Sequence, residues 1–171
     1  MKKMRKKLAD LATDWREQGL PPAKSLMTVG EELLAEKKDR GLGALWPQPP
    51  AMMTATMDDG WGAGLEPIRL FAEIAGMAVT HLGLLLEPAD VVAGCQRLRP
   101  DILGLTILHF ETEEILTRQI MPALPAATIA IVGGPIFKTM TAAELAEKPY
   151  RVADSLIDFI DFLLDWPGNG V

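Results

Sequence analysis

The chain contains an almost uninterrupted apolar run that decides its fold class, Ile102-Leu103-Gly104-Leu105-Thr106-Ile107-Leu108. A strand that is apolar throughout, instead of alternating between apolar and polar residues, is typical of a parallel sheet covered on both faces. On either side of this run, strand-like and helix-like segments alternate with short connections, which is the signature of βαβ units. We therefore predict an α/β fold built on a parallel sheet.

The elements of this sheet are expected from residue 51 onward. The predicted strands are Ala51–Met57, Met77–Leu82, Ile102–Leu108, Thr128–Val132 and Tyr150–Ala153. The predicted helices are Leu65–Ala75, Pro88–Leu98, Thr112–Ala123, Ile136–Ala146 and Ser155–Trp166. Right-handed crossovers favour a doubly wound, flavodoxin-like or Rossmann-like sheet of five strands in the order 2-1-3-4-5. Ligands bind such sheets where the winding reverses, here at the carboxyl ends of the first and third strands.

The first 50 residues have a different pattern. Two helices are predicted, Lys3–Gln18 and Ala23–Arg40, and the breaker sequence Gly19-Leu20-Pro21-Pro22 separates them. The segment Gly41–Pro50 holds too much Gly and Pro for a helix or a central strand and is predicted to be a linker. We therefore expect a short helical hairpin with its linker over residues 1–50, followed by the α/β domain over residues 51–171.

Composition narrows the function classes. The chain has 171 residues, 49% of them hydrophobic, and a net charge of −6, so it can bury one good core. Residues 1–40 carry ten Lys and Arg against seven Asp and Glu, whereas the remainder carries seven against sixteen. This acidic body argues against nucleic-acid binding. Because the chain also lacks an apolar stretch of about twenty residues and a signal-peptide core, we expect a cytoplasmic protein without a membrane span.

The single cysteine, Cys95, excludes an internal disulfide and any metal site built from several cysteines. It lies in a segment with helical spacing of apolar residues and is predicted to be a small buried packing residue.

A glycine-rich loop, Asp59-Gly60-Trp61-Gly62-Ala63-Gly64, follows the first predicted strand. Its glycines indicate a backbone that turns tightly and is approached closely. The spacing does not match the G-x-G-x-x-G pattern of dinucleotide sites, and His81 stands where such a site needs an acidic residue. A nicotinamide or flavin dinucleotide is therefore not favoured.

Three ordered motifs resemble another family. Asp59-Gly60-Trp61-Gly62-Ala63-Gly64 follows the first strand, Thr106-Ile107-Leu108 ends the third, and Gly133-Gly134 follows the fourth. Together they resemble the cobalamin-binding domain of corrinoid methyl-transfer proteins, methionine synthase and several mutases, whose pattern is Asp-x-His-x-x-Gly, Ser-x-Leu and Gly-Gly. The resemblance covers about residues 51–166, and Trp61 replaces the family's histidine.

The resemblance implies a cobalamin (corrinoid) site, whose residues would be Asp59, Trp61, Gly64, Thr106, Leu108, Gly133 and Gly134. The glycines would leave room for the cofactor's long nucleotide arm, and the Thr106 hydroxyl would bind a polar atom of that arm. In family members the histidine binds cobalt and the aspartate holds its other nitrogen. Trp61 cannot take that role, because indole offers only an N–H donor.

The tryptophan leaves three outcomes open. In the first, which we favour, cobalamin binds without a protein ligand below cobalt, while Trp61 packs against the macrocycle and donates its N–H to Asp59. In the second, cobalamin keeps its own dimethylbenzimidazole as the lower ligand. In the third, the site holds another planar ligand or none, and Trp61 is a packing residue of the loop.

Other polar residues receive structural interpretations. His109, at the end of the third strand, is more readily explained as a hydrogen-bonded strand-end residue than as a cobalt ligand, and His81 as a packing residue. Carboxylates that complement a helix N-terminus explain Glu111, Glu113 and Glu114, and a structural role is likewise expected for Asp58. No catalytic residue is predicted, since Ser25 and Ser155 lack the surroundings of a hydrolase nucleophile.

The resemblance implies a corrinoid protein that carries a methyl group between methyltransferase subunits and is not an enzyme by itself. One alternative is a regulatory domain that senses a corrinoid or another tetrapyrrole, and another is a degenerate, non-binding subunit. In methyl-transfer relatives a helical bundle caps the cofactor. Here the hairpin is short, so we expect either a reduced cap that includes Trp46 or a homodimer through the N-terminal helices.

Overall fold

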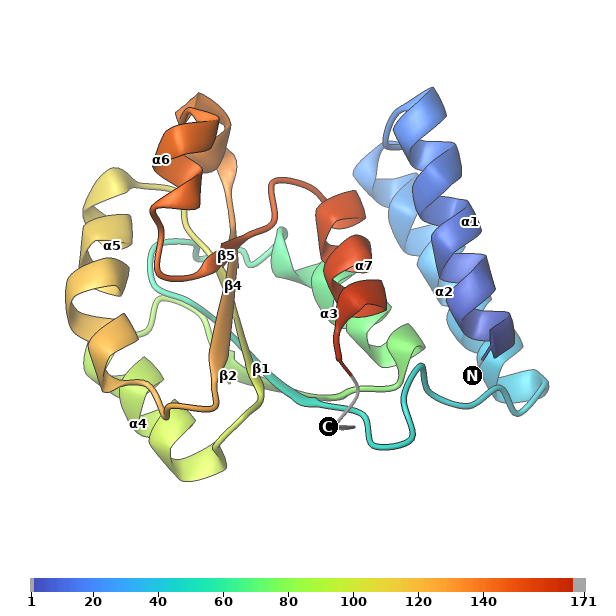
Figure 1. Cartoon of the computed structure of the whole chain (residues 1–171), viewed down its shortest axis with the longest axis horizontal. Coiled ribbons are helices and arrows are strands. Elements are labelled where there is room, and N and C mark those ends of the chain that lie inside the picture. The colour runs from blue at the N-terminus through green and yellow to red at the C-terminus, as the bar shows by residue number, and fades with distance from the viewer. Residues whose placement is uncertain (1, 168–171) are drawn as a thin grey trace. The chain divides into compact units, whose positions relative to one another are not determined.

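The computed structural model, which describes residues 2–167, contains a five-stranded sheet of order β2-β1-β3-β4-β5 (Figure 1). The strands are β1 (Ala51–Thr56), β2 (Ala78–Gly83), β3 (Ile102–Thr106), β4 (Ile129–Gly133) and β5 (Arg151–Val152). β1 pairs with β3, β3 with β4 and β4 with β5, each time in parallel. The predicted fold class and strand order are therefore confirmed.

Register aligns the carboxyl ends of the central strands. Thr56 of β1 is opposite Thr106 of β3, and Thr106 is opposite Gly133 of β4. All three residues end their strands, so the loops that follow them leave the sheet at one edge. The predicted meeting of the first and third strands at a switch point is thus present.

The helices that alternate with these strands are α3 (Leu65–Ala75), α4 (Pro88–Leu98), α5 (Phe110–Ile115), α6 (Ala142–Ala146) and α7 (Leu156–Asp165). Two predicted helices are less regular than expected. The segment after β3 continues from α5 into a π turn, η1 (Leu116–Ile120), and a 3-10 turn, η2 (Met121–Ala123). Pro122 explains this ending, because proline lacks an N–H and its ring collides with the carbonyl four residues earlier in a regular helix.

The predicted helix Ile136–Ala146 is broken in two. A 3-10 turn, η3 (Pro135–Thr139), precedes α6, and Met140 between them is extended. Thr141 starts α6 with a capping box, in which its hydroxyl accepts the Glu144 backbone N–H while the Glu144 carboxylate accepts the Thr141 backbone N–H. A residue in the N-cap conformation cannot continue the preceding turn, so the helix restarts there.

The chain forms two compact units. One comprises residues 51–65 and 79–154, and it holds nearly all of the sheet. Its main cluster joins one face of β1, β3 and β4 to residues of α4 and η1, including Met53, Leu103, Val132, Val91 and Leu116. Cys95 is a buried member of this cluster, as predicted, and burial raises the pKa of its thiol to about 11.

The other unit comprises residues 1–50, 66–78 and 155–171, of which 1 and 168–171 lie outside the described residues. It contains the predicted hairpin, α1 (Lys2–Gln18) and α2 (Ala23–Asp39). Since both units contain distant parts of the chain, the domain division at residue 50 stays a prediction.

The apolar faces of the hairpin are buried within this second unit. Met4, Leu8, Ala12 and Trp15 of α1 are buried, α1 contacts α7, and the Trp15 ring meets Phe71 edge-on at 5.8 Å. In α2, a Cβ on the buried Gly30 would lie 2.4 Å from Leu70 Cδ2, so α2 packs closely on α3.

Trp46 is also buried, and its indole N–H donates to the Trp166 carbonyl at 3.2 Å. These contacts occupy the faces that were expected to cap a cofactor or to drive dimerisation. They give no support to a dimer through the N-terminal helices.

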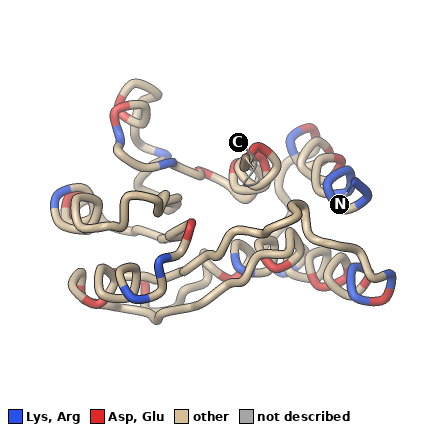
Figure 2. Tube along the Cα trace, turned by 60° about the horizontal axis from the view of Figure 1, so that its bottom comes forward, with Lys and Arg blue, Asp and Glu red and all other residues tan. Residues whose placement is uncertain are grey.

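Five basic residues occupy the first turns of α1, where Figure 2 shows blue beside the N-terminus: Lys2, Lys3, Arg5, Lys6 and Lys7. Lys7 pairs with Glu36 of α2 at 2.8 Å, so part of this charge is used inside the hairpin. Within residues 2–167, no helix is both long and apolar enough to cross a bilayer.

Candidate functional site

The loop after β1 is organised by Asp59. Its Oδ1 accepts the backbone N–H groups of Trp61 at 2.8 Å and Gly62 at 3.0 Å, and the residue is only 7% exposed. An aspartate that bonds backbone N–H groups two and three residues ahead stabilises a tight turn. The Gly62 carbonyl then accepts the Leu65 N–H at 2.9 Å, where α3 begins. Asp59 therefore shapes the loop through its Oδ1, while its Oδ2 has no partner within residues 2–167.

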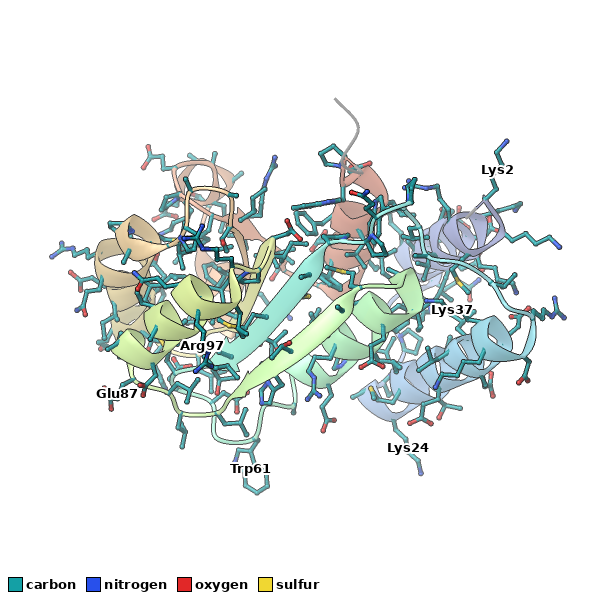
Figure 3. All side chains as sticks on the ribbon, turned by 90° about the horizontal axis from the view of Figure 1, so that it is seen from below. Lys2, Lys24, Lys37, Trp61, Glu87 and Arg97 are labelled. Atoms are coloured by element: carbon teal, nitrogen blue, oxygen red, sulfur yellow. The ribbon has the colours of Figure 1, made fainter. Side chains whose placement is uncertain are left out.

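Trp61 projects away from the protein. Its side chain is the most exposed large apolar group among the described residues, at 90%, and Figure 3 shows the ring beyond the loop ribbon. Asp59 bonds the backbone N–H of Trp61, whereas the indole N–H donates to no group in the described chain. The indole bond to Asp59 that we expect in a cofactor-bound protein is thus not needed to hold the loop.

Gly64 and Thr106 lie in contact across the ends of β1 and β3. A Cβ on Gly64 would be 3.1 Å from Thr106 Cγ2 and 3.3 Å from Thr106 Oγ1. Thr106 is 9% exposed, and its hydroxyl has no hydrogen-bond partner among residues 2–167. Its oxygen is not one of the buried polar atoms without a partner in the described chain, so it is accessible to solvent or to a ligand.

Gly133, the last residue of β4, and Gly134, which follows it, both lie close to neighbouring backbone atoms. Gly134 has φ +137° and ψ 162°, and a Cβ there would lie 1.9 Å from the Ile107 carbonyl oxygen. A Cβ on Gly133 would lie 2.9 Å from the Ala153 carbonyl oxygen. The Ile107 N–H donates to the Gly133 carbonyl at 2.9 Å, so the loop after β3 is bonded to the last residue of β4.

Asp58 connects the ends of β1 and β3. Its Oδ2 accepts the backbone N–H groups of Leu108 and His109, each at 3.0 Å. The structural role predicted for this carboxylate is therefore present. Its Oδ1 is buried and has no partner in the described part of the chain.

The two histidines lie on different segments of the unit that holds the sheet. His109 is exposed and precedes α5 without capping it through its side chain. His81 lies within β2, with its Nδ1 3.1 Å from Thr54 Oγ1. Over residues 2–167, no group of three or more His, Cys, Asp or Glu side chains is arranged to hold a metal ion.

The structure adds residues that the sequence analysis missed. Thr56, the last residue of β1, donates its hydroxyl to the Asp59 carbonyl and accepts the Leu85 N–H at 3.2 Å. It thereby joins the loop after β1 to the loop after β2, where Leu84 and Leu85 are exposed. The signal was present in the sequence as three successive leucines, residues 84–86, where a polar loop is usual.

A buried carboxylate lies further along the same unit. Glu113 of α5 accepts hydrogen bonds from the Thr117 and Tyr150 hydroxyls and from Lys148 Nζ. Burial alone would raise the pKa of Glu113, but these hydrogen bonds outweigh burial, so its pKa is lowered overall. Burial and the bond to Glu113 raise the pKa of Tyr150. This network connects α5 to the segment before β5. The carboxylate of Glu113, which we predicted to complement a helix N-terminus, thus has a structural role in this network.

The fold is shared with proteins of known cofactor. It is similar to that of a cobalamin-binding protein from Desulfitobacterium hafniense DCB-2, with a TM-score of 0.71 and 17% identity over 96% of this chain and 80% of that one. It is also similar to the monomethylamine corrinoid protein of Methanosarcina barkeri, with a TM-score of 0.59 and 15% identity over 81% of this chain and 64% of that one.

One curated protein is related in sequence. Ethylmalonyl-CoA mutase of Cereibacter sphaeroides is 33% identical over 88 residues, which make up 51% of this chain and 14% of the mutase. The match therefore spans only a small part of that protein's length. No protein-family model matches the chain. These comparisons assign the architecture of corrinoid-binding proteins to this chain.

Proposed function

We propose that this chain binds a corrinoid at the carboxyl edge of its sheet and carries a methyl group between methyltransferase partners. The observation that carries the proposal is the position of three motifs. Residues 59–64 follow β1, residues 106–108 begin at the last residue of β3, and Gly133-Gly134 begins at the last residue of β4. The register of these strands brings all three motifs to one edge of the sheet. The similarity in fold to a cobalamin-binding protein and to a methylamine corrinoid protein supports the same ligand and the same kind of partner.

The residues at this edge fit a corrinoid. Thr106 is nearly buried as a residue, but its hydroxyl has no partner within residues 2–167 and can bond a polar atom of a nucleotide arm. Gly64 keeps the approach to Thr106 free of a side chain. Trp61 presents a flat apolar surface of the kind that packs against a macrocycle, and it offers no lone pair to a metal.

A bound corrinoid would supply the cobalt-centred methyl-transfer chemistry, and the protein would supply binding and orientation. Asp59 holds the backbone of the loop that carries Trp61, and Asp58 holds the backbone of Leu108. The site would therefore be organised by backbone hydrogen bonds, with the position below the metal left without a protein donor.

Cofactor binding is tested by adding hydroxocobalamin to the purified chain and recording the visible spectrum after gel filtration. We expect retained corrinoid with the spectrum of a cofactor whose own base is detached from cobalt. The electron paramagnetic resonance spectrum of the Co(II) state should lack nitrogen splitting from a lower ligand. If no corrinoid is retained, the proposal is wrong. Nitrogen splitting would contradict the ligand-free arrangement and would mean that the cofactor's own base or a histidine such as His109 binds cobalt.

Replacing Trp61 by histidine tests the placement of the loop. The free Oδ2 of Asp59 is available to accept an N–H from the introduced imidazole, which would fix the tautomer needed for metal ligation. Trp61→His should therefore show nitrogen splitting in the Co(II) spectrum, and Trp61→Phe, the matched aromatic control, should not. An unsplit spectrum in Trp61→His, with cobalamin bound, would mean that residue 61 does not lie below the metal.

A further inference from the structure

Three apolar side chains form an exposed surface on the loops after β1 and β2, and we call it the platform. It consists of Trp61, Leu84 and Leu85, whose exposed fractions are 90%, 37% and 60%. The loops touch each other here. A Cβ on Gly60 would lie 3.3 Å from Leu85 Cδ1, and a Cβ on Gly62 would lie 2.7 Å from Leu84 Cδ2. The leucines thus pack against the backbone on both sides of Trp61.

The platform is held in place by Thr56 and by an unusual backbone conformation. Leu85 has φ +52°, a left-handed conformation that a leucine rarely adopts. Thr56 Oγ1 accepts the Leu85 N–H, and the Thr56 carbonyl accepts the Leu86 N–H at 2.9 Å. Strained residues that the surrounding structure holds in place are concentrated at binding sites. The strain here keeps a leucine in water, where it contributes no packing to the core.

The position and chemistry of the platform point to a flat, largely apolar ligand. Trp61 belongs to the same loop as Gly64, which meets Thr106 at the carboxyl edge of the sheet. Thr56 bonds both Asp59 of that loop and Leu85 of the loop after β2. None of its side chains can donate an electron pair to a metal. An indole and two leucines instead suit van der Waals contact with a broad ring.

We propose that the platform is a binding site for the lower face of the corrin ring, in which Leu84 and Leu85 extend the surface begun by Trp61. This inference rests on the proposed function and adds the loop after β2 to the site. It also separates two contributions to binding, since the platform contacts the ring whereas Thr106 contacts the nucleotide arm.

Two corrinoids distinguish these contributions. Hydroxocobalamin carries the nucleotide arm, and cobinamide has the same ring without it. Leu85→Asn keeps a residue that tolerates the left-handed conformation but removes the apolar surface. It should weaken binding of both corrinoids by about tenfold, as expected from losing most of one leucine's burial. Thr106→Val should weaken binding of cobalamin and leave cobinamide unaffected.

Leu98→Asn is the matched control. Leu98 is a comparably exposed leucine, at 43%, but it ends α4 before β3 begins, at the opposite edge of the sheet. The affinities of Leu98→Asn for both corrinoids should equal those of the unchanged protein. Affinities are measured by isothermal titration, and circular dichroism checks that each variant is folded.

A second measurement observes Trp61 directly. The indole N–H resonance of Trp61, assigned from its loss in Trp61→Phe, should shift when Co(III) cobinamide is added and should exchange more slowly with solvent. If the chain binds corrinoid, but Leu85→Asn binds equally well and the Trp61 resonance does not move, the platform inference is overturned while the proposed function stands. A platform that stays exposed would then be available to a protein partner. If the unchanged chain binds neither corrinoid, both proposals fail.

Discussion

Replacing Gly134 by alanine tests whether the Gly-Gly motif is required by the fold before any ligand is considered. Gly134 adopts φ +137° and ψ 162°, a region that is almost restricted to glycine, and holding another residue there costs about 1–3 kcal/mol. The added methyl would also lie 1.9 Å from the Ile107 carbonyl oxygen, so the backbone must move, which typically costs about 1–3 kcal/mol more. We expect a total loss of about 2–6 kcal/mol, a large part of the stability of an ordinary domain.

Gly19→Ala is a control that measures the cost of the backbone conformation without a steric clash. Gly19 has φ +90°, but a Cβ there would meet nothing within 4 Å. Its replacement should therefore cost only about 1–2 kcal/mol. The free energy of unfolding is measured by urea denaturation with circular dichroism, and hydrogen exchange follows the Ile107 amide, which bonds the Gly133 carbonyl. Equal losses in the two variants, with the Ile107 amide still protected, would refute the steric reasoning.

Three further predictions concern the unit that holds the sheet. The pKa of Glu113 is lowered in the folded state, so its contribution to stability is present above the unfolded pKa and is lost as the pH falls through the folded one. Urea denaturation from about pH 6 to about pH 3 should therefore show a larger loss of stability for the unchanged protein than for Glu113→Gln, and parallel curves would contradict this. Thr56→Val removes the bonds to the Asp59 carbonyl and the Leu85 N–H, so it should lower the free energy of unfolding by about 1–2 kcal/mol and speed hydrogen exchange at Leu85. An unchanged exchange rate would mean that Thr56 does not hold the loop. Cys95, whose thiol pKa is raised to about 11 by burial, should react with a disulfide reagent at pH 8 only after denaturation, and rapid reaction of the folded protein would contradict its burial.

The local sequence predicts the regular elements well where start and stop signals are strong. The helix Pro88–Leu98 has its predicted bounds, because Pro88 suits the first turn and Arg99 ends the helix in a left-handed conformation. The helix predicted over Ile136–Ala146 is broken, although Thr141 and Glu144 have the spacing of a capping box. A cap inside an apolar stretch is a restart signal, and apolar periodicity alone does not reveal it.

The sequence also predicts where most residues of the candidate site lie. Asp59, Gly64, Thr106 and Gly134 reach one edge because parallel strands deliver their carboxyl ends there. The direction of Trp61 is not predictable in this way. Its direction depends on Asp59 bonding the Trp61 backbone and on Leu84 packing against Gly62. These contacts exist only once the loops after β1 and β2 have folded against each other.

The sequence by itself determined the order of strands and helices, the parallel sheet and the edge at which its motifs meet, since continuous apolar runs and their connections restrict the topology. Only the tertiary structure decided which apolar residues are covered. Trp15 and Trp46 are buried and contact Phe71 and Trp166, which lie far from them in the sequence, whereas Trp61 and Leu85 are exposed to water. The physical reason is that apolar character drives a side chain to be buried, but the partner that buries it is set by contacts between distant segments.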